Sequence, residues 1–219
     1  MGENGQVKPT AQPIYDELKK QILSGERAPG EPLRQDEIAR QYGVSKIPVR
    51  EALMKLEVDG FVLIRKNKGA IVREVSATEI LNIMDIRVAL ECKALELSIP
   101  NMIASDIELA GKILDDYSKH SDPAQWSDMN LRFHHALYEP CSNPLLLRMI
   151  SDLQQRIGPQ LRLLVTTVTG LERPQAEHAA ILEACRVGDG GKAVELLRKH
   201  IETTKKETAA KLRRIDKRI

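Results

Sequence analysis

The sequence predicts a mainly α-helical protein with a small N-terminal domain and a larger, all-helical C-terminal domain. Three observations lead to this fold class. Apolar residues recur at helical spacing along most of the chain. The segment FVLIRKNKGAIV (61–72) is rich in β-branched residues around a glycine turn, which is typical of a β-hairpin. The length of 219 residues favours two domains, expected at 1–75, with a flexible N-terminal tail, and at 76–219.

Composition narrows the class of protein. The formal net charge is only +2, so the basic residues after Ser45 and at 65–68 form local clusters on a protein that is not generally basic. No apolar run of about 18 residues and no signal-peptide core are found. Cys92, Cys141 and Cys185 lack CxxC spacing, which favours reduced thiols over disulfides or a zinc ribbon. We therefore expect a cytoplasmic protein that does not associate with membranes.

Two short helices are expected at the start of the chain. Apolar residues recur at helical spacing over 14–22, and Gly25 ends that helix. The segment APGEPL (28–33) is rich in turn residues and predicts a connector. A second helix is expected over residues 35–42, with Gly43 ending it.

A third helix is expected to begin after Ser45. The Ser45 hydroxyl can cap free amide groups, and Pro48 falls in the first turn, where its missing N–H costs nothing. Lys46, Ile47 and Arg50 point away from the apolar face of this helix. That apolar face consists of Val49, Ala52, Leu53 and Leu56. Two helices joined by a tight glycine-containing turn, the second with a basic outward face, indicate a helix-turn-helix.

The hairpin completes the pattern of a winged helix. Gly69 provides the backbone freedom that a tight turn after residues 67–68 needs. A short basic helix alone is usually a solvated face, but the turn, the cap and the basic-tipped hairpin together predict binding to double-stranded DNA. The third helix would enter the major groove, and the hairpin would follow the backbone or the minor groove. The residues expected to contact DNA are Arg34, Ser45, Lys46, Pro48, Arg50, Lys66, Lys68 and Gly69.

The first part of the chain resembles a known family. Residues 14–76, IYDELKKQILSGERAPGEPLRQDEIARQYGVSKIPVREALMKLEVDGFVLIRKNKGAIVREVS, are similar to the DNA-binding domain of the GntR family of bacterial transcription regulators. The order and spacing of GVSKIPVREAL..LE.DG extend over the whole expected recognition helix. The fragments IRVALE, NLRFHHAL, EHAAIL and LRKHI resemble the all-helical effector domain, the FCD domain, of the FadR-type branch.

This resemblance implies a ligand-responsive transcription regulator, a repressor or an activator, and not an enzyme. In that branch a small carboxylate ligand, often together with a metal, controls binding to the operator. A helical bundle of this size can enclose a pocket and also present a dimerisation surface, which a palindromic operator requires of its reader. The expected partners are therefore operator DNA, a small organic acid and a second copy of the chain.

Three of the five histidines are expected to face the interior from three different helices. His134 lies four residues after Asn130 in DMNLRFHHALYEPC, so both side chains can point into the core. His135 is turned about 100° away by the helix geometry. His178 and His200 share their faces with apolar residues of two later helices. A single inward histidine is usually a hydrogen-bonded core residue, whereas three together favour a shared purpose.

Three imidazoles and an oxygen ligand suit Zn²⁺, or another first-row metal such as Ni²⁺, and leave positions open for water or a carboxylate. The trio resembles the metal-binding set of the family, which gives Asn130, His134, His178 and His200 as the expected ligands. Many family members have Asp at the position of Asn130. A neutral amide binds metal more weakly than a carboxylate, although its carbonyl oxygen can still serve as a ligand.

Two arginines are candidates for binding the effector. Arg87 lies in an apolar stripe, where an always-charged guanidinium needs a partner. That partner is either Glu91, one turn further on, or a ligand carboxylate that also reaches the metal. The resemblance favours the second alternative. Arg162, in GPQLRLLV, is a weaker candidate for the same role.

An alternative function is a metal-dependent hydrolase or lyase, since three histidines around an open metal can activate water. Such an enzyme also needs a general base near that water. The only inward acids expected near these histidines are Asp85 and Glu91, which favours the regulator. A helical adaptor that only dimerises would leave the basic hairpin without a role.

Overall fold

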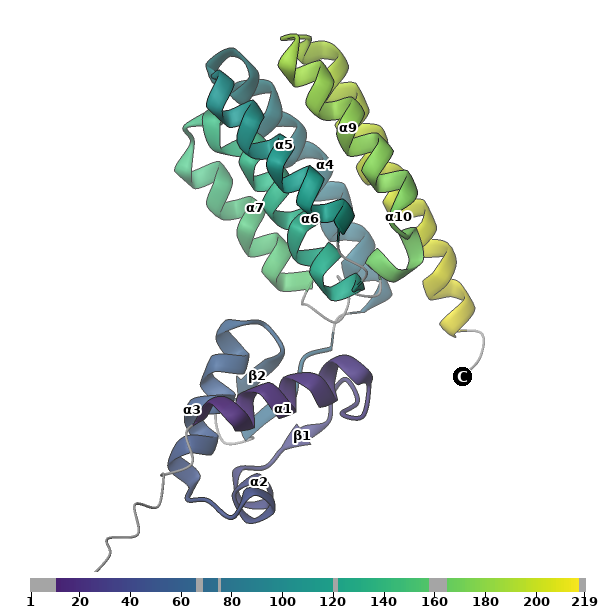
Figure 1. The fold of residues 1–219 in the computed structure, drawn as a ribbon. Helices are drawn as coiled ribbons and strands as arrows, with labels where there is room; N and C mark the ends of the chain where they lie inside the picture. Colours follow the sequence, from purple (N-terminus) through teal and green to yellow (C-terminus); the bar gives the residue numbers. More distant parts are fainter. Residues whose placement is uncertain (1–10, 66–68, 75, 120–121, 158–164, 217–219) are drawn as a thin grey trace, which may run out of the picture. The chain divides into compact units, whose positions relative to one another are not determined.

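The computed structural model describes residues 11–65, 69–74, 76–119, 122–157 and 165–216. The chain divides into two compact units, one formed by the residues before Ser76 and one that begins at Ser76 (Figure 1). The first is a winged helix with a three-stranded sheet, and the second is an all-helical bundle, so the predicted fold class is confirmed. No helix within the described ranges has the length and apolar character needed to span a membrane.

The N-terminal unit contains three helices, α1 (Ala11–Ser24), α2 (Gln35–Tyr42) and α3 (Lys46–Val58). α1 and α2 both pack against α3. Gly43 has a φ of 63° and its N–H bonds to carbonyls of the last turn of α2. This left-handed conformation favours glycine, which explains why the helix ends there as predicted.

Three short strands form the wing. β1 (Pro32–Leu33), β2 (Val62–Arg65) and β3 (Gly69–Val72) are arranged in the order β1-β3-β2, and both pairs are antiparallel. The prediction of a plain connector over residues 28–33 was wrong at its end, because β1 pairs with β3 as an edge strand. An edge position tolerates the proline that made the segment read as a turn.

The core of this unit lies between the helices and the sheet. The four residues predicted for the inner face of α3 are all buried, together with apolar residues of α1 and the strands. The innermost side chains, each at most 1% exposed, are Leu18, Ile22, Leu33, Val49, Ala52, Leu53, Leu56, Val62 and Val72. Because the apolar face of α3 is buried in this core, the face that carries the basic residues points outward.

The second unit is a bundle of α4 (Ala77–Ser98), α5 (Ala104–Lys119), α6 (Pro123–Tyr138), α7 (Pro144–Ile157), α9 (Glu172–Arg186) and α10 (Gly190–Asp216). Figure 1 shows α9 and α10 side by side, and α10 also packs against α4, while α5 packs against α6 and α9. All three cysteines are buried and none forms a disulfide, as predicted. The core runs through the middle of the bundle and is apolar except for a few polar side chains, which include three histidines.

Candidate functional site

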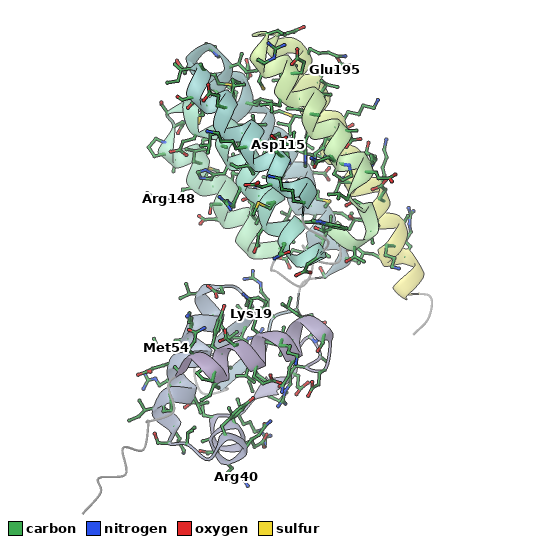
Figure 2. All side chains as sticks on the ribbon, viewed as in Figure 1. Lys19, Arg40, Met54, Asp115, Arg148 and Glu195 are labelled. Carbon is green, nitrogen blue, oxygen red and sulfur yellow. The ribbon has the colours of Figure 1, made fainter. Side chains whose placement is uncertain are left out.

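The outward face of α3 combines charged and apolar side chains. Lys46 and Arg50 are exposed, Ile47 is 70% exposed, and Met54, labelled in Figure 2, is 50% exposed. Ser45 occupies the N-cap position, but its side chain makes no capping hydrogen bond, so the predicted cap was wrong. The first amide groups of α3 consequently have no bond from this hydroxyl, and a helix N-terminus in that state is suited to a phosphate oxygen.

The neighbouring charges are held only loosely. Lys46 Nζ lies 2.5 Å from Asp36 Oδ1, and both side chains are about two-thirds exposed. Arg34, the N-cap residue of α2, reaches Glu37 at 3.3 Å, and both of these side chains are exposed as well. Exposed pairs of this kind contribute about 0–1 kcal/mol, so a nucleic acid phosphate can replace them at small cost.

The wing places Gly69 at the start of β3 with a φ of 75°. It pairs with Arg65 across the hairpin. Lys66 and Lys68, the other residues predicted for this contact, lie outside the described residues. Pro48 is the third residue of α3 and partly buried, which places its ring within the first turn as predicted.

The three inward histidines come together in the bundle. His134 of α6, His178 of α9 and His200 of α10 are 1%, 0% and 7% exposed. One nitrogen from each ring lies within 4.8 Å of the others. The prediction that three helices direct three imidazoles to one place is confirmed.

Two of the histidines have a polar neighbour at Nδ1. His200 Nδ1 lies 2.7 Å from Glu177 Oε2, which also accepts from the Arg173 guanidinium. His134 Nδ1 lies 3.2 Å from the Tyr138 hydroxyl. Since Glu177 is an acceptor, His200 donates from Nδ1 and directs a bare Nε2 inward.

Within the described residues, two ring nitrogens of the cluster have no hydrogen-bond partner, and two others face each other. His134 Nε2 is buried without a hydrogen bond in the described structure, and His178 Nδ1 is in the same state. His178 Nε2 and His200 Nε2 face each other at 3.3 Å. Buried polar atoms without partners are rare in folded proteins, so the unpartnered His134 Nε2 near two other imidazoles calls for an explanation such as an ion.

The electrostatic environment keeps two of the rings neutral. Burial lowers the pKa of His134 well below 6.5, and the neighbouring His200 and Arg87 lower it further. Burial likewise lowers the pKa of His178, with His200, His134 and Arg173 adding to the effect. Neutral imidazoles carry the lone pairs that metals bind.

These residues fit a divalent metal. Around a tetrahedral ion with bonds of about 2.0–2.1 Å, ligand nitrogens lie roughly 3.3–3.5 Å apart. The facing Nε2 atoms of His178 and His200 already have this separation, and His134 Nε2 has no competing partner. An ion at the centre would satisfy all three nitrogens at once.

A cavity of about 60 Å³ opens beside this cluster. It is large enough for a few water molecules or a small ligand. Arg87, Asn130 and His200 all line it, and further polar lining comes from Ser127, Thr166 and Thr204. Asn130 lies one helical turn before His134, as expected for an oxygen ligand on the cavity side. Arg162 lies outside the described residues.

Glu91 is the protein partner of Arg87. Arg87 Nε donates to Glu91 Oε1 at 2.5 Å and Nη2 reaches Oε2 at 3.4 Å. The Arg87 side chain is 13% exposed and that of Glu91 is 0% exposed, so this is a buried pair and not an ordinary surface pair. Of the two alternatives left open by the sequence, the structure contains the pairing with Glu91, while the guanidinium still lines the cavity.

Two residues near the histidines were missed by the sequence reasoning. Tyr138 lies four residues after His134, the spacing of a neighbour on the same helix face, and its pKa is raised well above 10.0 by burial and by Glu91. Glu177 directly precedes His178 in the chain but serves His200 of another helix, which spacing cannot reveal. Asp85 is exposed and paired with Lys205, so it does not accompany the cluster.

Comparisons with known proteins agree with this geometry. Residues 10–72 match the family described as bacterial regulatory proteins, gntR family, and residues 82–203 match the FCD domain. The chain is 30% identical over 202 residues to the HTH-type transcriptional repressor GlaR of Escherichia coli (strain K12), covering 86% of this chain and 91% of that protein.

Two further proteins extend the comparison. The chain is 29% identical over 210 residues to BphR, an uncharacterized HTH-type transcriptional regulator of Paraburkholderia xenovorans (strain LB400), covering 90% of this chain and 84% of that protein. The solved structure of E. coli McbR/YncC matches with a TM-score of 0.65 and 26% identity, covering 88% of this chain and 93% of that one.

Proposed function

Because the chain belongs to the gntR family of bacterial regulatory proteins and carries an FCD domain, it is a transcription regulator, and we propose that a small carboxylate effector, bound beside a divalent metal ion, controls its affinity for an operator. The observation that carries this proposal is the group of three buried histidines next to a cavity lined by Arg87. The family resemblance inferred from the sequence is confirmed.

The exposed face of α3 supports the DNA-binding part of the proposal. Lys46 and Arg50 project from the helix that would enter the major groove, and Arg34 is the N-cap residue of the preceding helix. Bidentate arginine contacts read guanine, while lysine contacts to phosphate add affinity that depends on salt. We propose the same role for Ser45, for Pro48 and for Gly69 of the wing, and, from the sequence alone, for Lys66 and Lys68.

The cluster of His134, His178 and His200 supports the metal. Imidazole nitrogens suit Zn²⁺ and also Ni²⁺, and Asn130 would add a carbonyl oxygen from the cavity side. A bound ion supplies positive charge and open coordination positions for an anionic ligand. Arg87, which also lines the cavity, would then attract the same carboxylate.

A homodimer acting in the cytoplasm completes the proposal. A helix-turn-helix that reads a palindromic operator requires two copies of its recognition helix. The enzymatic alternative receives no support, because Glu91 is held by Arg87 and Tyr138, and Glu177 by His200 and Arg173. Neither carboxylate is available as a general base.

The metal is tested by comparing His178→Ala with His135→Ala. His135 is adjacent to His134 but has a side chain that is 61% exposed, so it serves as a matched control. We expect the wild type and His135→Ala to retain zinc after dialysis and to gain thermal stability with added Zn²⁺, as preferential binding to the folded state requires. His178→Ala should lose both properties. Equal zinc content in all three proteins would contradict the proposed site.

The effector is tested on an operator selected from a random duplex library. Operator affinity of the zinc-loaded protein is measured against dicarboxylates, hydroxy acids and sugar acids, with Arg87→Lys and wild type side by side. We expect at least one acid to change the affinity of the wild type, and the response of Arg87→Lys to need a higher concentration because lysine lacks the bidentate fork. Failure of every acid with zinc bound would overturn the carboxylate effector while leaving the metal intact.

A further inference from the structure

A continuous hydrogen-bonded chain joins the cavity arginine to one of the three histidines. Arg87 donates to Glu91, and the Tyr138 hydroxyl donates to Glu91 Oε2 at 2.8 Å. His134 Nδ1 lies 3.2 Å from the same hydroxyl. These hydrogen bonds connect α4 to α6, and the side chains in the middle are buried: Tyr138 is 1% exposed and Glu91 is 0% exposed.

The direction of this chain follows from counting protons. A phenol has one proton to donate and two lone pairs to accept with. The Arg87 guanidinium suits an ionised Glu91, which can only accept, so the phenol proton goes to the carboxylate. His134 Nδ1 therefore has to donate to the phenol oxygen, which places its proton on Nδ1 and leaves Nε2 bare.

The opposite arrangement costs Glu91 its shorter hydrogen bond at Oε2 and leaves a buried N–H of His134 without a partner. If His134 carried its proton on Nε2, the phenol would turn toward Nδ1 and Glu91 Oε2 would lose its short donor. The Nε2–H would in addition find no acceptor, because Nε2 has no hydrogen-bond partner in the described structure. Both consequences are unfavourable in a buried site.

We propose that Tyr138, oriented by the Glu91–Arg87 pair, is a positioning residue that holds His134 in the Nδ1–H tautomer and so directs the Nε2 lone pair toward the shared centre of the three histidines. This inference rests on the metal in the proposed function. It gives the buried Arg87–Glu91 pair a role beyond packing, since the pair sets which group donates and which accepts in the hydrogen bonds that lead to His134.

The tautomer is measured on the metal-stripped full-length protein by nitrogen-15 NMR with labelled histidine, with His134 assigned from a His134→Gln sample. We expect Nδ1 protonated and Nε2 bare in the wild type. Tyr138→Phe removes the acceptor and should shift His134 toward the Nε2–H form. Glu91→Gln should reverse the chain: the amide oxygen faces Arg87, its NH₂ donates to the phenol oxygen, and the phenol proton turns to Nδ1.

Ser98→Ala is the matched control. The Ser98 hydroxyl is a buried donor that lies 2.9 Å from the Tyr138 carbonyl oxygen, so its loss disturbs the same contact between α4 and α6. Ser98→Ala removes none of the hydrogen bonds between Arg87 and His134. The tautomer of His134 in this variant should therefore equal that of the wild type. A shift in Ser98→Ala as large as in Tyr138→Phe would assign the effect to packing and overturn the proposal.

Zinc affinity, measured by competition with a chromophoric chelator, gives the second readout. We expect Tyr138→Phe and Glu91→Gln to bind Zn²⁺ about 10- to 100-fold more weakly, as is typical when a partner of a ligand histidine is lost, and Ser98→Ala to match the wild type. An Nε2–H tautomer in the wild type, or unchanged affinity in Tyr138→Phe, would overturn this inference alone. Absence of zinc binding by the wild type would overturn the proposed metal as well.

Discussion

The ion pairs on the outer face of α3 and those beside the histidine cluster of the bundle differ in their exposure to solvent. On α3 the pair of Lys46 with Asp36 has both side chains about two-thirds exposed. In the bundle the pair of Arg87 with Glu91 is 13% and 0% exposed. A surface group can change partners because water satisfies it during the exchange, whereas a buried group needs a protein or ligand partner at all times. The first arrangement suits contact with DNA, and the second suits a preformed site.

The largest expected difference between the two regions is in stability. Removing one member of a buried ion pair leaves the other charged and unpaired, which costs about 3–5 kcal/mol. Glu91→Ala should therefore lower the free energy of unfolding by about that amount, measured by urea denaturation. Asp36→Ala, which breaks the pair on the DNA face, should change it by about 0–1 kcal/mol.

A control on the same helix separates burial from helix propensity. Glu96 lies on α4, pairs with Lys93 and is 60% exposed. Glu96→Ala should resemble Asp36→Ala and not Glu91→Ala. Comparable losses for Glu91→Ala and Glu96→Ala would mean that the buried pair is not more costly to break than a surface pair.

The next expected effect is a loss of folding stability at acid pH, which comes from the buried histidine cluster. The pKa values of His134 and His178 are lowered in the folded protein, so the unfolded state binds more protons once the pH falls below about 6.5. Stability of the metal-free protein is thus retained above this pH and lost below it. Two such histidines imply a loss of about 2–3 kcal/mol between pH 7.5 and 5.5.

Urea midpoints in the presence of a chelator measure this loss. His135→Gln should follow the wild-type profile, since that side chain is 61% exposed. His178→Gln should show a shallower dependence because one of the two lowered pKa values is removed. A wild-type stability that does not change over this pH range would contradict the prediction, because it would mean that folding does not lower the pKa values of His134 and His178.

Periodicity predicted a large part of both regions. The inner face of α3 and the burial of His134, His178 and His200 follow from a repeat of 3.6 residues, because each helix hides one stripe. The strand β1 was not predicted. Its two residues begin with a proline, which is typical of a turn, and their conformation is decided by pairing with the distant strand β3. Glu177 could not be predicted because it contacts His200 of another helix, which spacing does not reveal. Tyr138 has the i,i+4 spacing to His134 within one helix, but its bond to Glu91 is a tertiary contact.

The smallest of the expected effects lies on the DNA face and leaves the fold untouched. Arg50 is exposed on α3, and a bidentate contact to guanine contributes about 1–3 kcal/mol of discrimination. Arg50→Ala should weaken binding to the selected operator by about 5- to 150-fold at fixed salt, with the urea midpoint unchanged. Arg132→Ala, an exposed arginine of α6, serves as the control and should bind like the wild type. If Arg50→Ala weakened random and operator duplexes alike and reduced the salt dependence by about one unit, Arg50 would contact phosphate and the base reading would lie elsewhere on α3.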